Sequence, residues 1–301
     1  MIIDYQAADF LHLGLCMAGF DDVTVTNTCY KTNLERFKSF FYASPQVCER
    51  IFEDLQTHGI VNKLMPKVLL LALNYLKEYK TKHGLAAFVK LTEKTALNRS
   101  KEYVDYINEL RVAKIKWLFD DPETYPEMFA VSIDGVHCHI SEPRVEPSAG
   151  WYSKKYNKAG VAYELAIAIF HNQLCWINGP FPAGHNDKKI CSMPDGLIDQ
   201  LRKSGKKGIA DEGYRGSPND IATRNEFDSV DVKQFKRRVK ARHETFNSRL
   251  KQFGILSQRF RGQGPTKSDK RSALDKHKAA FESCCVIVQY ELENGNPLFD
   301  V

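Results

Sequence analysis

Three widely spaced acids, Asp134, Asp211 and Glu244, occupy positions where an acid is notable. Asp134 interrupts a β-rich run at residues 128–140, where aspartate is depleted and an unpaired buried charge is costly. Asp211 directly follows a second short β-rich run, and Glu244 lies in a basic stretch. Carboxylates are ligands that Mg²⁺ takes from proteins, and a pair of such ions activates water and neutralises the charge that develops when a phosphodiester is cut. The three acids therefore predict metal-dependent phosphodiester chemistry, provided that the fold brings them together.

Each acid taken alone also has an ordinary structural interpretation. Asp134 can be a turn residue or a strand-end cap, and Asp211 can cap the turn at Gly213. Glu244 can pair with Lys240 one helical turn earlier, which is worth only a few tenths of a kcal/mol. These alternatives stay open until the positions of the three acids are compared.

The elements that must position the acids are short strands and two helices. Residues 128–140, 160–170 and 174–177 are β-rich runs, which predict three consecutive antiparallel strands. A helix over residues 188–203 and a fourth strand over residues 207–210 follow, and Asp211 comes directly after that strand. Ligand-facing groups gather at strand ends in α/β sheets.

A last helix is predicted over residues 232–253, with an apolar stripe at heptad-like spacing. Glu244 falls on the opposite side of this helix, where its neighbours are basic and amide residues: Arg237, Lys240, Asn247, Ser248 and Lys251. The order strand–strand–strand–helix–strand–helix is compatible with a ribonuclease H-like α/β domain. In such a domain the three acids meet at one end of a mixed sheet flanked by helices.

The chain before this domain is predicted to be all-helical. Helices from Pro66 to Gly84, over residues 85–94 and from Ser100 toward residue 118 are compatible with a helix-turn-helix at about residues 66–118. Arg99 and Lys101 would then meet DNA, although a plain helical bundle explains the same pattern. A turn-rich stretch at residues 120–126 marks the boundary, so we expect domains at residues 1–122 and 123–301.

The composition is that of an ordinary core-forming protein, with 43% hydrophobic and 27% charged residues in 301, enough for two domains. The longest apolar run, residues 68–73, is far shorter than a membrane span, and the first residues lack the basic cluster of a secretory signal. The eight cysteines show no CxxC or Cys/His ligand spacing. We therefore expect reduced, buried thiols of an intracellular protein and no contact with a membrane.

Positive charge is concentrated in one segment. Residues 233–278 hold fifteen lysines and arginines against three acids, a net charge of +12 where the whole chain carries +6. Concentration of this kind favours a polyanion such as nucleic acid, although a solvated basic face remains the ordinary alternative.

Residues 125–301 resemble the catalytic domain of DDE-type transposases, specifically the DDE superfamily endonucleases of the PIF/Harbinger kind. The motifs that carry the resemblance occur in order at residues 132–138, 152–155, 160–165, 181–187, 209–214, 242–247 and 250–253. Each motif is weak alone, and their order over most of the C-terminal half makes the resemblance specific.

The resemblance implies a metal-dependent enzyme that cuts and transfers DNA strands, with Asp134, Asp211 and Glu244 as catalytic residues and metal ligands. The implied cofactor is Mg²⁺, or Mn²⁺, and the implied partner is double-stranded DNA, contacted by Lys251. Arg237 and Lys240, which share the helix face of Glu244, would hold the phosphate backbone beside it. The resemblance further implies a homo-oligomer on DNA, a Myb-like accessory protein, and a nuclear protein, or a cytoplasmic one in a prokaryote. Asp187 matches an acid often present in the family, but it precedes the predicted helix and is left outside the triad.

Two other hypotheses compete with an active transposase. A host-recruited descendant would bind DNA or a partner without cutting, and a generic nuclease of repair or RNA processing would share the fold and the metal chemistry. Cleavage that depends on terminal-repeat sequence discriminates the transposase from both.

Overall fold

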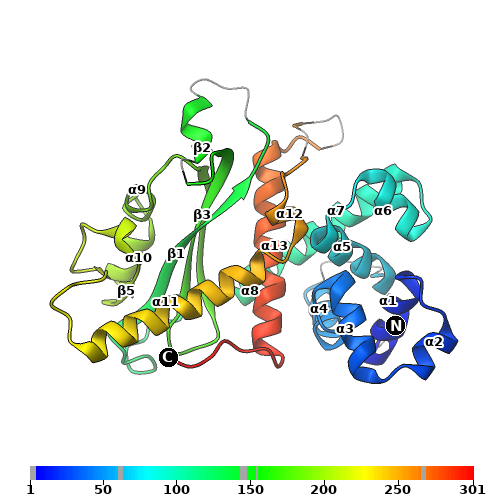
Figure 1. The fold of residues 1–301 in the computed structure, drawn as a ribbon, viewed down its shortest axis with the longest axis horizontal. Helices are drawn as coiled ribbons and strands as arrows, with labels where there is room; N and C mark the ends of the chain where they lie inside the picture. The colour runs from blue at the N-terminus through cyan, green and yellow to red at the C-terminus, as the bar shows by residue number, and fades with distance from the viewer. Residues whose placement is uncertain (1–4, 60–63, 143–147, 154, 263, 266–268) are drawn as a thin grey trace. The chain divides into compact units, whose positions relative to one another are not determined.

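The computed structural model describes residues 5–59, 64–142, 148–153, 155–262, 264–265 and 269–301 (Figure 1). Lys154, which belongs to one of the motifs above, lies outside the described residues. The chain divides into two compact units. The first comprises Met1–Lys114, Leu250–Gln258 and Asp275–Asn296, and the second comprises Ile115–Arg249, Arg259–Leu274 and Pro297–Val301. The domain limits predicted at residue 122 stay a prediction.

The first unit is all-helical, as predicted. Its helices are α1 (Ala7–Met17), α2 (Asp22–Asn27), α3 (Tyr30–Phe41), α4 (Pro45–Thr57), α5 (Pro66–Glu78), α6 (Lys82–Val89), α7 (Glu93–Glu109), α8 (Arg111–Lys114), α12 (Gly254–Ser257) and most of α13 (Ala273–Glu293). Pro45 and Pro66 open α4 and α5, where the missing N–H of proline removes no helical hydrogen bond. The helix-turn-helix assignment stays a prediction.

Two helix boundaries predicted in this region are wrong. α5 ends before Tyr79, which adopts a left-handed conformation, so Gly84 is not its stop residue and lies inside α6. α7 begins before Ser100, whose buried hydroxyl donates to a carbonyl of the preceding turn. The true starts are set by Thr81 and Thr92, whose side-chain oxygens accept backbone N–H groups of the first turns of α6 and α7.

The second unit is built on a mixed sheet. Its strands and short helical turns are β1 (Phe129–His139), η1 (Ser148–Trp151), β2 (Tyr152–Ser153), β3 (Lys158–Ala168), β4 (Leu174–Pro182), β5 (Lys207–Ile209), η2 (Glu212–Tyr214) and β6 (Ile221–Ala222). β3 runs antiparallel to β1 and β4, and β5 runs parallel to β1 and β6. The strands therefore lie in the order β4–β3–β1–β5–β6, with β2 also pairing with β3. This order confirms the predicted ribonuclease H-like α/β architecture.

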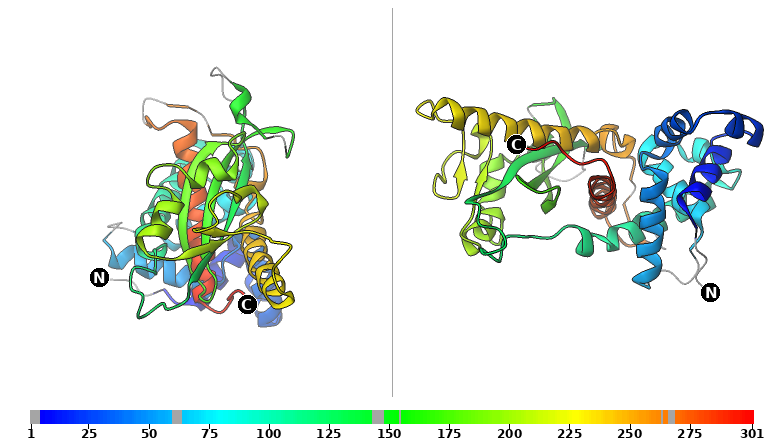
Figure 2. Two further views of the ribbon diagram at one scale, coloured as in Figure 1. Left: turned by 90° about the vertical axis from the view of Figure 1, so that its left-hand side faces the viewer. Right: turned by 90° about the horizontal axis from the view of Figure 1, so that it is seen from below.

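Helices pack on both faces of the sheet, and the side chains of β1 point alternately to one face and the other. Val131 and Ile133 pack in one core with residues of α9 (Asp187–Cys191) and α10 (Leu197–Lys203). Ser132, between them, faces α11 (Val230–Leu250), where its hydroxyl hydrogen-bonds Nδ1 of His243 at 2.9 Å. Figure 2 shows α11 along one face of the sheet, and α9 and α10 on the other.

The helix predicted over residues 188–203 is two helices, because the chain turns at residues 192–196 between α9 and α10. The long helix α13 has no counterpart in the sequence-based prediction, which took the helix at residues 232–253 as the last one. α13 is buried along most of its length, and Ser283 ties it to α7 by donating to the carbonyl of Val104 at 2.8 Å. Its even apolar distribution hides the amphipathic period that would have revealed it.

All eight cysteines are free thiols, and six of them are buried as expected. Cys16 and Cys29 are exposed, so the expectation of burial is wrong for these two. Within the part of the chain that the structure describes, none of the helices combines the length and the apolar character that crossing a bilayer requires.

Candidate active site

Asp134 lies in β1, two residues beyond the last pair that β1 forms with β5 in the described structure, Ser132↔Ile209. Its side chain is half-buried. Oδ1 accepts the backbone N–H of Gly135 at 2.8 Å, and Oδ2 accepts a hydrogen bond from Nδ2 of Asn247 at 2.9 Å. The carboxylate is therefore held between its own strand and α11.

The same register brings Asp211 to Asp134. Each acid lies two residues beyond the Ser132↔Ile209 pair, and parallel strands deliver both acids to the same end of the sheet. Oδ1 of Asp211 accepts the N–H of Gly213 at 2.9 Å, so the predicted capping role is also present. Capping orients this carboxylate, and it leaves Oδ2 without a hydrogen bond among the described residues.

A third acid, Asp187, shares this end of the sheet. Burial raises the pKa of Asp187, and the charges of Asp211 and Asp134 raise it further, against the opposing charge of Lys155. Burial likewise raises the pKa of Asp134, and Asp211 adds to the rise, while the N–H of Gly135 and two lysines oppose it. Asp134, Asp187 and Asp211 therefore repel one another in a half-buried group.

Asp187 does not precede the helix, as the sequence-based argument assumed, but is the first residue of α9. Asn186 caps α9 by accepting the N–H of Lys189 at 2.7 Å, which is the signal that could have placed the helix start correctly. The reason given for leaving Asp187 outside the acidic group is therefore wrong.

Glu244 lies on α11, whose position is set by the residues just before it. His243 bonds Ser132, and the buried guanidinium of Arg242 donates to the carbonyls of Ala168 at 2.6 Å and His171 at 2.7 Å. Glu244 itself is exposed, and its carboxylate makes no hydrogen bond or ion pair in the described part of the chain. The structure brings Asp134 and Asp211 together but shows no direct contact of Glu244 with either.

Glu244 instead lines a pocket of about 580 Å³ on the second unit. Ala210, the residue before Asp211, lines the same pocket, together with Arg237 and Lys240. The wall is predominantly basic, because Arg224, Lys233 and Lys236 also line it. Lys236 is paired with Asp228 at 2.7 Å, so the other cations of the wall carry most of its positive potential.

The predicted DNA contacts fall into two groups. Arg237 and Lys240 are exposed in this pocket, and Lys240 is near enough to Asp134 to oppose the rise in its pKa. Lys251 is exposed directly after α11, while Arg99 is exposed and Lys101 half-buried on α7. The latter three belong to the first unit, so they are not part of the pocket.

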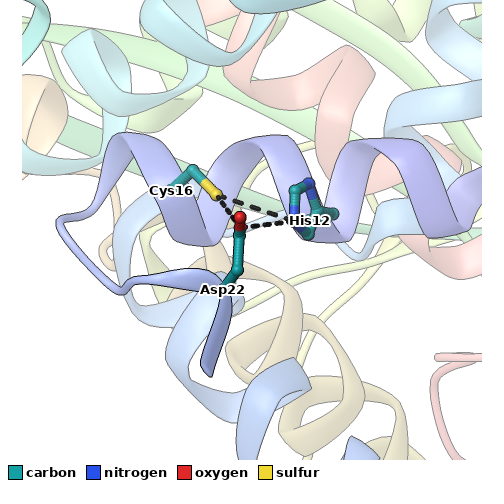
Figure 3. Close-up of side chains that lie close together, drawn as sticks. All are labelled: His12, Cys16 and Asp22. Carbon is teal, nitrogen blue, oxygen red and sulfur yellow. Dashed lines mark hydrogen bonds and ion pairs between the residues drawn. The ribbon is translucent and has the colours of Figure 1, made fainter. Parts of the chain in front are cut away.

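The acids are suited to a hard cation but do not form a closed ligand cluster. Among the described residues, one group of three potential ligands has all of its ligand atoms within 4.8 Å, namely His12, Cys16 and Asp22 in the first unit (Figure 3). The interpretation that no Cys/His ligand spacing occurs therefore missed His12 and Cys16, one turn apart on α1. The carboxylates of the second unit still fit Mg²⁺ or Mn²⁺, because all their donors are oxygens and a cation would relieve their repulsion.

Two further residues near the acids were not recognised as important from the sequence. Asn247 was placed beside Glu244 on the side away from the apolar stripe, yet it is buried and holds Asp134. Glu164 is buried in β3 with an exposure of 1% and pairs with Gly135 across the β1–β3 register. An acid in the middle of the run GVAYELAIAIF was the available signal, since aspartate and glutamate are depleted in strands.

The mixed sheet with its flanking helices, and the carboxylates at one of its ends, define a ribonuclease H-like protein. The family model described as "DDE superfamily endonuclease" matches residues 133–289. This match spans more than half of the chain, and the chain belongs to that family. Comparison with curated proteins and with solved structures found no match. Members of the family use divalent metal ions and act on DNA.

Proposed function

We propose that this chain is a metal-dependent endonuclease and strand transferase of the transposase type, which cuts double-stranded DNA at the ends of a mobile element. The observation that carries the proposal is the Ser132↔Ile209 register, which places Asp134 and Asp211 at one end of the sheet in a DDE-family chain. Asp134 and Asp211 would hold Mg²⁺ or Mn²⁺, and Glu244 would complete the set. When bound, the metal ions supply an activated water and neutralise charge on the phosphate.

The residues of the chain prepare this site before any metal binds. The Gly135 N–H and the Asn247 amide hold both oxygens of Asp134, and the Gly213 N–H holds one oxygen of Asp211. Fixing the carboxylates in this way reduces the reorganisation that accompanies binding and reaction. His243 is buried and its pKa is lowered to about 3, so it is neutral and holds α11 against β1 through Ser132.

The basic pocket beside Glu244 supports DNA as the substrate. Arg237 and Lys240 are exposed on the wall that Glu244 shares, where they would bind phosphates on either side of the cut. Burial raises the pKa of Asp134 and Asp187, and the charge of Lys155 opposes both rises, so Lys155 would contact the DNA backbone near these acids. Arg99, Lys101 and Lys251, which belong to the first unit, would also contact DNA phosphates. The active form would be a homo-oligomer on DNA, with a Myb-like accessory protein where DNA recognition requires one.

Cleavage of DNA that carries the terminal inverted repeats of the parent element tests the proposal. Asp134→Asn, Asp211→Asn and Glu244→Gln are compared with wild type in Mg²⁺ and in EDTA, with the exposed Asp195→Asn on the same unit as the matched control. We expect the three variants to lose activity by about 10³-fold or more, since several kcal/mol of charge stabilisation is removed. Undiminished cutting by the variants would reject the site. Retention of the DNA without metal-dependent nicking would favour the host-recruited binding protein, and cutting indifferent to the repeats would favour a generic nuclease.

A further inference from the structure

Asp187 reaches the centre of the acidic group because two glycines leave room for it. Its Oδ1 lies 3.1 Å from the position that a Cβ atom on Gly135 would occupy. Its Oδ2 lies 2.8 Å from the corresponding position on Gly213, and Oδ1 of Asp211 lies 3.0 Å from that same point. The two carboxylate oxygens are therefore less than 6 Å apart, a separation that a centre of two metal ions about 3.5 to 4 Å apart can bridge.

Asp187 has no partner that would account for this position. Its carboxylate makes no hydrogen bond and no ion pair within the described residues, while burial and two neighbouring acids make its charge unfavourable. A half-buried charge without a partner is costly unless a cation compensates it. The nearby positive charge of Lys155, an exposed side chain, offsets this only in part.

A second observation at the same place is independent of the acidic group. Glu164 lies directly opposite Gly135 in the antiparallel β1–β3 pair, so its side chain extends from the same face as the missing side chain of Gly135. Oδ1 of Asp187 occupies that space. Glu164 is 1% exposed, and neither of its oxygens meets hydrogen-bond geometry in the described part of the chain, although the indole of Trp176 lies close enough to oppose the rise in its pKa. An unsatisfied buried carboxyl group is thus aimed at the carboxylate of Asp187.

The two faces of the sheet contribute differently to the site. Asn247 reaches Asp134 from α11, and Glu244 lies on that helix one turn earlier. Asp187 comes from α9, on the face where Tyr214 and Cys191 are buried. Burial raises the pKa of both groups, and the nearby charge of Asp187 adds to the rise.

We propose that Asp187 is a metal ligand that acts together with Asp134 and Asp211, binding a divalent cation from the α9 face of the sheet. The ligand class is a hard cation such as Mg²⁺ or Mn²⁺, because every donor is a carboxylate oxygen. Glu164 is then a positioning residue that lies against Asp187 and does not itself touch the ion. The proposal deepens the metal chemistry of the proposed function and rests on it.

Binding of Mn²⁺ to the full chain without DNA tests this assignment. Free Mn²⁺ is followed by electron paramagnetic resonance for wild type, Asp187→Asn, Asp134→Asn and the exposed control Asp195→Asn. We expect Asp187→Asn to weaken Mn²⁺ binding by about tenfold or more, as Asp134→Asn does, because one charged ligand is lost. The control should bind as wild type. Unchanged Mn²⁺ affinity in Asp187→Asn beside a loss in Asp134→Asn would overturn the proposal.

A measurement on wild type avoids dependence on the folding of a variant. Fe²⁺ bound in the site and treated with ascorbate and peroxide generates radicals that cut the nearest backbone. We expect cuts at Gly135, Gly213 and Asp187, and cuts at the two glycines alone would overturn the proposal. Failure of this ligand assignment and failure of the proposed nuclease function give different results. If Mn²⁺ binding depends on Asp187 but the protein does not cleave DNA, the proposed nuclease function is wrong and the ligand assignment stands. If the protein cleaves DNA but Mn²⁺ binding does not depend on Asp187, the assignment of Asp187 as a ligand is wrong and the nuclease function stands.

Discussion

Two groups of potential ligands in this chain, one on each unit, differ in donor chemistry, in spacing along the chain and in exposure. His12, Cys16 and Asp22 lie within eleven residues of one another, are all exposed, and bond to each other at 2.9 to 3.9 Å. Asp134, Asp187 and Asp211 come from three separate elements and are half-buried. Asp134 and Asp211 are held by N–H and amide donors, and the carboxylate of Asp187 makes no hydrogen bond among the described residues.

The two groups differ in whether their charges are compensated within the protein, and the proposed cation site is the group with uncompensated charge. In the exposed group, the imidazole of His12 and the carboxylate of Asp22 satisfy each other, and water screens what remains. In the buried group, burial raises the pKa of Asp134 and Asp187, the charge of Asp211 adds to both rises, and the fold maintains the arrangement at a cost in stability. A fold keeps such a cost where a ligand or a reaction needs it.

Among the substitutions that test the difference between the exposed and the buried group, the largest change in stability is expected at Glu164, beside the buried group. Burial raises the pKa of Glu164 to about 8, with Asp187 adding to the rise and Trp176 opposing it. The folded state therefore holds a proton that the unfolded chain releases near pH 4.5, so stability falls as pH rises from 4.5 to 8. Between pH 5 and pH 9, the unfolding free energy of Glu164→Gln should rise by up to roughly 4 kcal/mol relative to that of wild type.

Urea unfolding in EDTA at pH 5, 7 and 9 measures this change. Glu212→Gln, an exposed acid on the same unit, is the matched control and should show no comparable trend. If the difference in unfolding free energy between Glu164→Gln and wild type is constant over this pH range, the raised pKa of Glu164 is contradicted.

Asn247→Asp adds a fourth carboxylate to the buried group without changing the size of the side chain. The substitution removes the donor to Oδ2 of Asp134 and places a like charge beside it. We expect a loss of about 1 to 3 kcal/mol of unfolding free energy at pH 7 in EDTA, partly restored by Mg²⁺. Ser248→Asp, exposed on the next position of α11, controls for helix charge. An equal loss in both variants, or no recovery with Mg²⁺, would count against a cation site.

Lys240→Gln tests whether the pocket beside Glu244 binds DNA phosphate. Loss of one phosphate contact should weaken binding about 3- to 10-fold and reduce the slope of log K against log salt by about one. Lys203→Gln, exposed at the end of α10, should leave the slope unchanged. Fluorescence anisotropy over a salt series gives both quantities, and identical slopes for Lys240→Gln and wild type would remove this pocket from the DNA interface.

The smallest effect is expected in the exposed group. His12 and Asp22 keep 57% and 79% of their side-chain surface accessible, and pairs of this kind contribute less than about 1 kcal/mol. Asp22→Asn should therefore change the unfolding free energy by less than that amount and leave Mg²⁺-dependent DNA cleavage as in wild type. A clear loss of cleavage would mean that the exposed group serves the reaction, and the contrast drawn above would fail.

Patterns along the chain predicted β1, β3, β4, β5 and the long helix α11 of the second unit, but not the two-residue strands β2 and β6. The alternation around Asp134 and the short run before Asp211 predicted β1 and β5, and their parallel pairing follows from the fold that the motif order implies. Boundaries in the first unit were less accessible, because the threonine caps at Thr81 and Thr92 competed with the more conspicuous Gly84 and Ser100. α13 was missed because a helix buried on all sides has no amphipathic period.

The amino-acid sequence alone determined the types of most elements, the basic segment and the pair Asp134 and Asp211. Strand periodicity and local charge are short-range properties that a sequence displays directly. Only the packed structure decides that Asp187 joins this pair, that Asn247 turns inward and that Glu164 is buried beside them. Each of these depends on register and on the space above a glycine in a different element. Distances between residues far apart in the chain are set by how the helices pack on the sheet, which no local pattern encodes.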